Sequence, residues 1–243
     1  METTETDVYH KKSFLKAMSY TPLANAEFVQ KLWSAPDELV NDGPRLVQKN
    51  CVRTTVKFES EEFQYVVKRH LERSWRHFVK QCFSFSRAAK CWDDTWFLVR
   101  HGYPTPLPIA FRENRLGPLR GNSYYVYQYI EGRTFKEVAT GLKNQRLLRK
   151  LVSQIAEIWL LHQQLGINLT DGHPANFIVD STGKIWVIDL DKLQRIPSRI
   201  DSDSILRKSF DATIKGVIGD HKIIDFAHKK LTDLLQPRRR NAA

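Results

Sequence analysis

The sequence is poor in the features that mark several specialised classes of protein. It has three cysteines in 243 residues, Cys51, Cys82 and Cys91, with no CxxC pair, which excludes a disulfide framework and suits a reducing compartment. No segment approaches the ~20 consecutive apolar residues that span a bilayer. The first fourteen residues contain acids and lack an apolar core, so we expect no secretory signal peptide.

Acidic residues are also scarce relative to basic ones. The chain carries 27 Asp and Glu against 38 Lys and Arg, a formal net charge of +11 at pH 7. With 42% hydrophobic residues it has the composition of a folded protein. The basic excess is dense from Lys68 to Lys90, where Glu72 is the one acid and aromatic residues interleave. This charge predicts an anionic partner, and nucleic acid, anionic lipid and phosphorylated small molecules all stay open.

The order of predicted elements indicates an α+β protein with two lobes. Two β-branched runs around a short polar turn predict a hairpin over 52–58 and 63–68. Apolar spacing and capping residues predict helices over 25–33, from Ser86 to Gly102, and over 145–165. A proline-rich connector over 103–109 and strands over 123–130, 177–179 and 185–188 complete the pattern. A strand-rich half followed by a helical half predicts a β-rich N-terminal lobe, 1–126, and a reduced helical C-terminal lobe, 127–243, rather than a sandwich or a doubly wound sheet.

Three polar residues of the second half have the spacing of a kinase catalytic loop. Asp171 is followed five residues later by Asn176, and a short hairpin then leads to Asp189 at the end of an apolar strand. Phosphoryl transfer needs a carboxylate that deprotonates the acceptor hydroxyl and oxygen ligands for Mg²⁺. We therefore predict Asp171 as the catalytic base and Asn176 and Asp189 as metal ligands. Taken singly, each is also an ordinary turn or capping residue.

The first half offers residues for binding ATP. Lys68 ends a Val-Val-Lys strand that is similar to the strand whose lysine contacts ATP phosphates in kinases. No glycine-rich loop precedes Lys68, and we expect Lys49 to supply charge there instead. Asp93, at the edge of the helical stripe Ala89, Trp92, Trp96 and Val99, is the predicted partner of Lys68. A hinge at Gln128, Tyr129 and Ile130 is predicted to offer backbone groups to adenine.

These residues together resemble the lipopolysaccharide core kinases, the Kdo and heptose kinase family, which has a protein-kinase-like fold. The resemblance covers about residues 49–192. The matching segments are Val66–Arg69, Ser86–Ala88, Gly102–Pro106, Tyr129–Gly132, Asp171–Asn176 and Ile188–Asp191. It implies ATP- and Mg²⁺-dependent phosphorylation of a sugar hydroxyl on the lipopolysaccharide inner core, with a lipid-linked core oligosaccharide as acceptor. It also implies a bacterial enzyme that acts at the cytoplasmic face of the inner membrane, peripherally bound to an anionic surface.

Three other functions stay open. The loop Asp171–Asn176 also suits an aminoglycoside-type small-molecule kinase. The absence of a glycine-rich loop, and Leu169 where kinase catalytic loops carry His, would fit a pseudokinase that binds nucleotide as a regulator. A nucleic-acid-binding module is the weakest alternative, because it leaves the Asp171, Asn176 and Asp189 spacing unexplained, and we expect no nucleic acid partner.

Overall fold

A computed structural model describes residues 7–42, 45–49, 53–59, 64–71, 85–116, 119–142, 144–196 and 202–235. The chain forms two compact units: a sheet unit (1–102 and 106–129) and a helical unit (103–105 and 130–243). The change of unit after Tyr129 lies three residues beyond the expected boundary at 126. Among the described helices, none has the length and apolar character that crossing a membrane requires.

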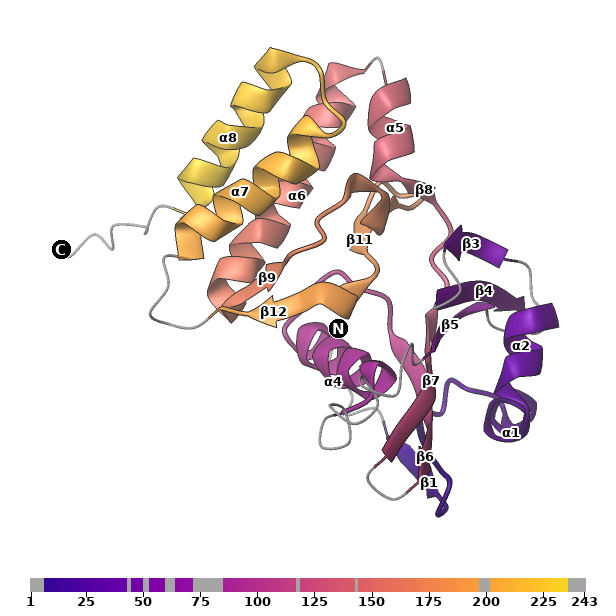
Figure 1. The fold of residues 1–243 in the computed structure, drawn as a ribbon. Coiled ribbons are helices and arrows are strands. Elements are labelled where there is room, and N and C mark those ends of the chain that lie inside the picture. Colours follow the sequence, from indigo (N-terminus) through magenta and orange to yellow (C-terminus); the bar gives the residue numbers. More distant parts are fainter. Residues whose placement is uncertain are drawn as a thin grey trace. The chain divides into compact units, whose positions relative to one another are not determined.

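The described helices and strands of the sheet unit have the following bounds (Figure 1). They are β1 (Tyr9–Lys12), β2 (Lys16–Tyr20), α1 (Ala26–Ser34), α2 (Pro36–Asp42), β3 (Arg45–Lys49), β4 (Arg53–Glu59), β5 (Gln64–His70), α4 (Arg87–Arg100), β6 (Pro108–Leu116) and β7 (Leu119–Gln128). The seven strands form one antiparallel sheet in the order β1-β2-β6-β7-β5-β4-β3. The predicted hairpin over 52–58 and 63–68 is confirmed as β4 and β5.

Helices cover both faces of this sheet, with α1 and α2 on one side and α4 on the other (Figure 1). On the first face, Phe28 and Leu32 of α1 join Tyr65 and Tyr124 in a buried cluster. The predicted helix over 25–33 is confirmed as α1, and the Asn25 side chain accepts a hydrogen bond from the Phe28 amide at 2.7 Å. Such a cap satisfies one of the amides that a helix start leaves unpaired.

The helix that covers the second face, α4, begins as predicted after Ser86, whose hydroxyl accepts from the Ala89 amide at 3.2 Å. Its buried face is turned from the predicted stripe, because Trp96 and Val99 are only half-buried. The buried α4 residues are Ala88, Ala89, Cys91, Trp92, Thr95 and Leu98. Contacts with the sheet set this rotation: Trp92 packs on Phe111, and the Tyr125 hydroxyl donates to Thr95 Oγ1 at 2.8 Å.

The helical unit is built around one long helix and short strand pairs. Its elements are β8 (Arg133–Thr134), α5 (Phe135–Gly141), α6 (Gln145–Leu165), β9 (Ile167–Leu169), η1 (Pro174–Asn176), β10 (Phe177–Val179), β11 (Ile185–Val187), η2 (Leu190–Lys192), β12 (Leu193–Arg195), α7 (Ser202–Lys215) and α8 (His221–Leu235). The strands pair as β11-β10-β8 and as β12-β9. The predicted helix over 145–165 is confirmed as α6.

A fully buried tryptophan of α6, Trp159, joins the parts of this unit. Its ring centroid lies 5.9 Å from that of Phe177 on β10 and 5.5 Å from that of Phe210 on α7. The indole Nε1 donates to Ser209 Oγ at 2.9 Å, so the polar edge of the buried ring is satisfied. One side chain thereby ties α6, α7 and the β10–β11 hairpin together.

The segment Tyr103–Thr105 belongs to the helical unit although the sequence places it in the first half. Tyr103 and His162 share a hydrogen bond of 2.8 Å between Oη and Nε2, and Thr105 Oγ1 donates to Val187 O at 2.9 Å. The Val187 amide donates to Pro104 O at 2.7 Å. Burial raises the pKa of Tyr103 and lowers the pKa of His162 to about 3, so this histidine is neutral. His162 is therefore a core residue of α6.

Candidate active site

The predicted catalytic loop lies between β9 and β10 and is fixed by its own side chains. The Asn176 amide nitrogen Nδ2 donates to the Asp171 carbonyl oxygen at 2.9 Å and closes the loop. His173 caps η1, because its Nδ1 accepts from the Ala175 amide at 3.2 Å. Asn and His here use hydrogen bonds to the local backbone, which is the usual way polar side chains shape turns.

The Asp171 carboxylate forms an ion pair with Lys192, whose Nζ lies 2.8 Å from Asp171 Oδ2. Lys192 ends η2, and β12, which begins at Leu193, pairs with β9 so that Leu193 lies opposite Leu169. The Lys192 carbonyl oxygen also accepts from the Thr170 hydroxyl at 3.0 Å. The backbone therefore places this lysine beside the predicted base, a role that our reading of the sequence did not assign to it. The sequence feature that could have identified it is a basic residue three positions after Asp189.

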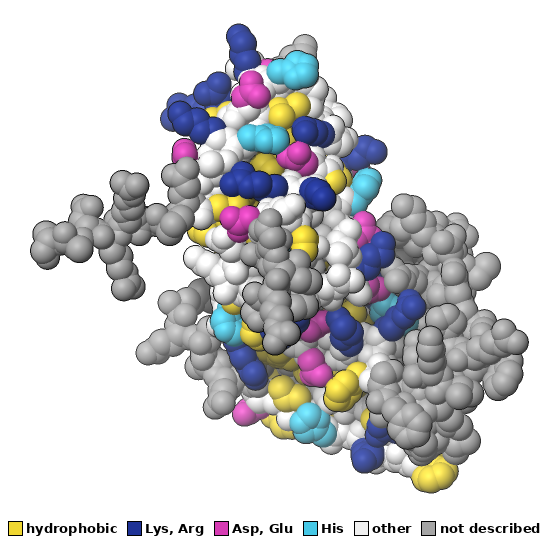
Figure 2. Space-filling model, turned by 60° about the vertical axis from the view of Figure 1, so that its left-hand side comes forward, with side chains coloured by type: hydrophobic (Ala, Val, Ile, Leu, Met, Phe, Trp, Pro, Cys, Tyr) yellow, Lys and Arg dark blue, Asp and Glu magenta, His cyan; other side chains and the backbone are white. Residues whose placement is uncertain are grey.

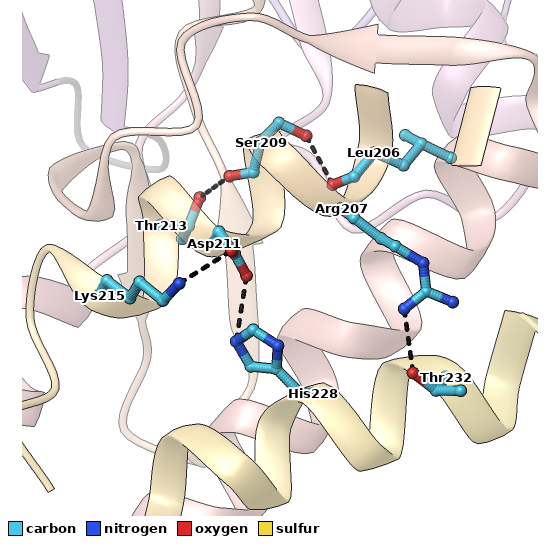
Figure 3. Close-up of polar contacts among 8 residues, drawn as sticks. All are labelled: Leu206, Arg207, Ser209, Asp211, Thr213, Lys215, His228 and Thr232. Carbon is cyan, nitrogen blue, oxygen red and sulfur yellow. Dashed lines mark hydrogen bonds and ion pairs between the residues drawn. The ribbon is translucent and has the colours of Figure 1, made fainter. Parts of the chain in front are cut away.

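The loop also contacts α7. The Thr213 hydroxyl of α7 donates to the Gly172 carbonyl oxygen at 2.5 Å. The same hydroxyl lies 3.1 Å from the Ser209 carbonyl oxygen one turn earlier in the helix (Figure 3). Gly172 also approaches this helix closely, because a Cβ atom on it would lie 2.8 Å from Thr213 Oγ1. Glycine is therefore required here for room, and a larger residue would push the loop away from α7.

Helix α7 is in turn tied to α8 by polar contacts (Figure 3). Asp211 lies 3.0 Å from Lys215 Nζ and 3.0 Å from His228 Nε2, and Arg207 donates to Thr232 Oγ1 at 2.9 Å. Figure 2 shows Lys and Arg side chains interspersed with Asp and Glu over this part of the surface. These contacts hold α7, the helix that the loop contacts through Thr213, against α8.

The two predicted metal ligands lie at the same end of the β10–β11 hairpin. Phe177 lies opposite Val187, and the Ile188 amide donates to the Asn176 carbonyl oxygen at 2.8 Å, so the residues that precede β10 and follow β11 are neighbours. Asp189 has φ +61°, and it is the one non-glycine residue with positive φ in the described part of the chain. A non-glycine residue in this conformation costs about 1–3 kcal/mol, and such strain is concentrated at functional sites.

The far end of the hairpin is fixed by Asp180. Burial acts to raise the pKa of this carboxylate, but hydrogen bonds from the Thr182 hydroxyl, Trp186 Nε1 and the Lys184 and Thr182 amides outweigh it and lower the pKa to about 2. The distances are 2.6 Å for the Thr182 hydroxyl and 2.8 Å for Trp186 Nε1. A hairpin closed in this way holds the Asn176 and Asp189 end in one geometry.

In the sheet unit, Lys68 lies on β5 and is buried, with 6% of its surface exposed. It pairs across the strands with Tyr125, so the two side chains share the sheet face that α4 covers. The predicted ion pair between Lys68 and Asp93 is not formed. The Asp93 side chain lies at the surface. Partial desolvation and the neighbouring Asp94 raise the pKa of its carboxyl group, whereas an adjacent lysine would lower that pKa. The rotation of α4 explains this, because its small and apolar residues, rather than its acids, face the sheet.

The other nucleotide-binding predictions have different outcomes. Lys49 ends β3, and neither its side chain nor residues 50–52 belong to the described part of the chain. At the hinge, the Gln128 amide donates to Leu107 O and the Tyr129 amide to Gln64 O, each at 2.9 Å. Two of the three hinge amides are thus used within the sheet unit, which leaves Ile130 as the candidate donor to adenine. Residues 72–84 of the basic run from Lys68 to Lys90 lie outside the described residues.

The donor set at the hairpin end fits a magnesium ion. Because Asn176 uses its amide nitrogen within the loop, the amide oxygen is the atom that it offers to a cation, and Asp189 follows the neighbouring strand at the same end of the hairpin. Amide and carboxylate oxygens are the protein ligands that Mg²⁺ prefers. A sheet unit with a buried strand lysine, and a helical unit that gathers Asp171, Asn176 and Asp189, define the protein-kinase-like class.

Comparison with known proteins identifies the family within this class. The model of the lipopolysaccharide kinase (Kdo/WaaP) family matches residues 37–208, and the chain belongs to this family. It is therefore a phosphotransferase that acts on sugar hydroxyls, a lipopolysaccharide kinase. The match leaves out β1, β2, α1 and α8.

Two solved structures share the fold. WaaP in complex with acyl carrier protein superposes with a TM-score of 0.62 at 18% identity, over 86% of this chain and 88% of that one. WbdD in a co-crystal with the kinase inhibitor LY294002 superposes with a TM-score of 0.50 at 16% identity, over 78% of this chain and 46% of that one. No curated protein matches the sequence. The protein-kinase-like fold predicted from the sequence is confirmed by the first of these structures.

Proposed function

We propose that this chain transfers the γ-phosphate of ATP, in the presence of Mg²⁺, to a hydroxyl of Kdo or heptose in the lipopolysaccharide inner core. The observation that carries the proposal is the arrangement around Asp171. Its carboxylate is paired with Lys192 at 2.8 Å, and its carbonyl is bound by Asn176 at 2.9 Å. Asp189 lies beside Asn176 at the hairpin end. A carboxylate base with a lysine beside it, and two side chains whose oxygens can bind Mg²⁺, are suited to phosphoryl transfer.

Each of these residues has a role that follows from its chemistry. Asp171 accepts the proton of the sugar hydroxyl as that oxygen attacks the phosphate. Lys192 holds the carboxylate in one orientation while the acceptor binds. Asn176 and Asp189 would hold Mg²⁺, which when bound neutralises charge on the transferred phosphate.

The nucleotide would be bound by residues of the sheet unit and the hinge. Lys68 would contact the phosphates, as the lysine of this strand does in kinases. Lys49 is a second proposed phosphate contact, at the end of β3. The backbone amide of Ile130 would donate to adenine, together with the carbonyl groups of Gln128 and Tyr129.

The acceptor would be a lipid-linked core oligosaccharide, and the protein would act at the cytoplasmic face of the bacterial inner membrane. The net charge of +11 supports this, because both the acceptor and the membrane surface are anionic. If the charge serves docking, binding to anionic vesicles weakens as salt rises. Binding that is indifferent to salt would count against this part of the proposal.

The proposal is tested with labelled ATP, Mg²⁺ and a panel of deacylated core sugars that carry Kdo, heptose or both. We expect label on the sugar with the natural protein and none above background with Asp171→Asn or Asp189→Ala. The matched control is Asp225→Asn, which changes an exposed aspartate of α8 and should leave transfer unchanged.

Two results would point to the alternatives. Transfer to aminoglycosides but to no core sugar would identify a small-molecule kinase. A rise in melting temperature with Mg-ATP, without transfer to any acceptor, would identify a nucleotide-binding regulator.

A further inference from the structure

The turn between β1 and β2 exposes two large apolar side chains on a fixed backbone. We call residues 11–16 the β1–β2 tip. The Ser13 amide donates to Lys16 O at 2.8 Å, the Lys16 amide donates to Ser13 Oγ at 3.1 Å, and the Arg115 amide of β6 donates to Leu15 O at 2.8 Å. The tip is therefore closed on itself and attached to the neighbouring strand.

The side chains at the end of the tip face solvent. Phe14 is 75% exposed and Leu15 is 55% exposed. Few large apolar side chains are so exposed in the described part of the chain, and these two are adjacent in sequence. A single exposed apolar residue is ordinary, whereas two together on a projecting turn are typical of an interaction site.

Positive charge surrounds this apolar pair. Lys11, Lys12 and Lys16 flank it, and no acid occurs between Val8 and Ala26. The ammonium groups of Lys11 and Lys16 lie 4.8 Å and 5.6 Å from the centre of the Trp33 ring, and Lys16 also donates to Trp33 O at 3.3 Å. Cation–π contacts of this kind hold the two lysines against α1. Lys12 is exposed.

Two further strands, β6 and β7, are paired at the same end of the sheet as the tip. Lys16 at the start of β2 lies opposite Asn114 near the end of β6, so the β1–β2 tip lies beside the last residues of β6 (Figure 1). Arg115 lies opposite Arg120, and Leu116 opposite Leu119, in the last pairs between these two strands. Glu113 of β6, which lies close to this end of the strand, is buried and paired with Arg115 at 3.2 Å. Basic and apolar residues therefore also occupy the paired ends of β6 and β7 beside the tip.

We propose that the β1–β2 tip docks on an anionic lipid bilayer, with Phe14 and Leu15 inserted among the lipids and the flanking lysines on the headgroups. An apolar end with a basic collar matches the two attractions of an anionic membrane, which are acyl chains below and negative charge at the surface. A stable protein interface buries about 1,200–2,000 Å², far more than two side chains at a turn can offer. The tip lies outside the segment that matches the kinase family, which begins at Asp37, so the docking element is separate from the matched segment.

This inference identifies the docking element for the membrane partner named in the proposed function, and it can be tested separately from catalysis. The full chain is sedimented with vesicles of phosphatidylcholine alone or with 30% anionic lipid added. We expect binding to the anionic vesicles, and a loss of about tenfold or more in the partition coefficient for Phe14→Ser combined with Leu15→Ser. Lys12→Ser should weaken binding about fivefold, the effect of one basic charge near an anionic surface.

Matched variants separate the tip from general surface effects. Leu147→Ser removes an exposed leucine of α6, and Lys150→Ser removes an exposed lysine of the same helix. Both should bind vesicles as the natural protein does. Phe14→Trp should retain binding and give additional tryptophan quenching by brominated lipid. Circular dichroism and melting temperature confirm that each variant is folded.

Each possible result either supports or overturns the docking proposal. Loss of vesicle binding in the tip variants alone, with transfer to a deacylated soluble sugar retained, supports the proposal. Unchanged vesicle binding by the Phe14/Leu15 variant overturns it, as does equal binding of the natural protein to uncharged vesicles. A tip variant that binds vesicles normally but loses self-association or a protein partner also overturns it. Tip-dependent vesicle binding by a chain that phosphorylates no sugar would leave the docking inference standing and refute the proposed function.

Discussion

Replacing Lys192 by Met removes the cation that pairs with Asp171 and keeps the length of the side chain. At 2.8 Å, the attraction of two unit charges is about 1.5 kcal/mol in water and about 6 kcal/mol at an effective dielectric constant of about 20. Lys192 is 55% and Asp171 36% exposed, so the lower figure applies, and exposed pairs measure about 0–1 kcal/mol. We therefore expect the melting temperature to change by no more than about 2–4 °C. Activity should change far more, because a misplaced reacting group costs about 100-fold in rate.

The assay is steady-state transfer of labelled phosphate to a core sugar, with kcat and KM measured separately. For Lys192→Met we expect kcat to fall about 100-fold with little change in the KM for ATP, and for Lys192→Arg a loss within about tenfold. Lys215→Met is the matched control, because Lys215 and Asp211 form a pair of 3.0 Å with exposures of 56% and 35%. If Lys192→Met loses no more activity than Lys215→Met, Lys192 does not position the base. If Lys192→Arg is as poor as Lys192→Met, the retained positive charge is not sufficient.

Two further predictions concern the support of the catalytic loop and the buried histidine. Thr213→Val removes the hydroxyl that donates to the Gly172 carbonyl oxygen. Urea unfolding should therefore show a free energy of unfolding lower by about 1–3 kcal/mol, and the transfer assay should show a lower kcat. An unchanged kcat would mean that α7 does not position the loop. The pKa of His162 is about 3 in the folded state, below its ordinary value of 6.5. The unfolded chain therefore binds a proton at a higher pH than the folded chain does, so the contribution of His162 to stability is complete above pH 6.5 and is lost as the pH falls toward 3. Between these values the free energy of unfolding should fall by roughly 1.4 kcal/mol per pH unit, and His162→Gln should remove that part of the slope. An identical slope in the variant would contradict the burial of a neutral His162.

The sequence predicted those parts of the fold that depend on neighbouring residues. Asn25 and Ser86 cap their helices because a capping side chain bonds to an amide three residues later in the same segment. The β4–β5 hairpin follows from β-branched runs on either side of a short turn. The spacing of Asp171 and Asn176 is likewise local, since five residues of chain form the loop.

Contacts between distant segments could not be predicted in this way. Lys192 reaches Asp171 only because β12 pairs with β9, and Thr213 reaches Gly172 over 41 residues of sequence. The face of α4 that packs on the sheet depends on partners such as Phe111 and Tyr125, which the helical pattern does not contain. The prediction of Asp93 as the partner of Lys68 was wrong for that reason.

The most direct test of the account is to identify the phosphorylated atom. The protein is incubated with ATP, Mg²⁺ and a deacylated inner-core oligosaccharide, and the product is analysed by phosphorus NMR, with Asp171→Asn in parallel. The account predicts a phosphate monoester on a Kdo or heptose hydroxyl, formed by the natural chain and lost in Asp171→Asn although Mg-ATP still binds. Transfer of phosphate to water alone, or a sugar phosphate formed at an undiminished rate by Asp171→Asn, would contradict it.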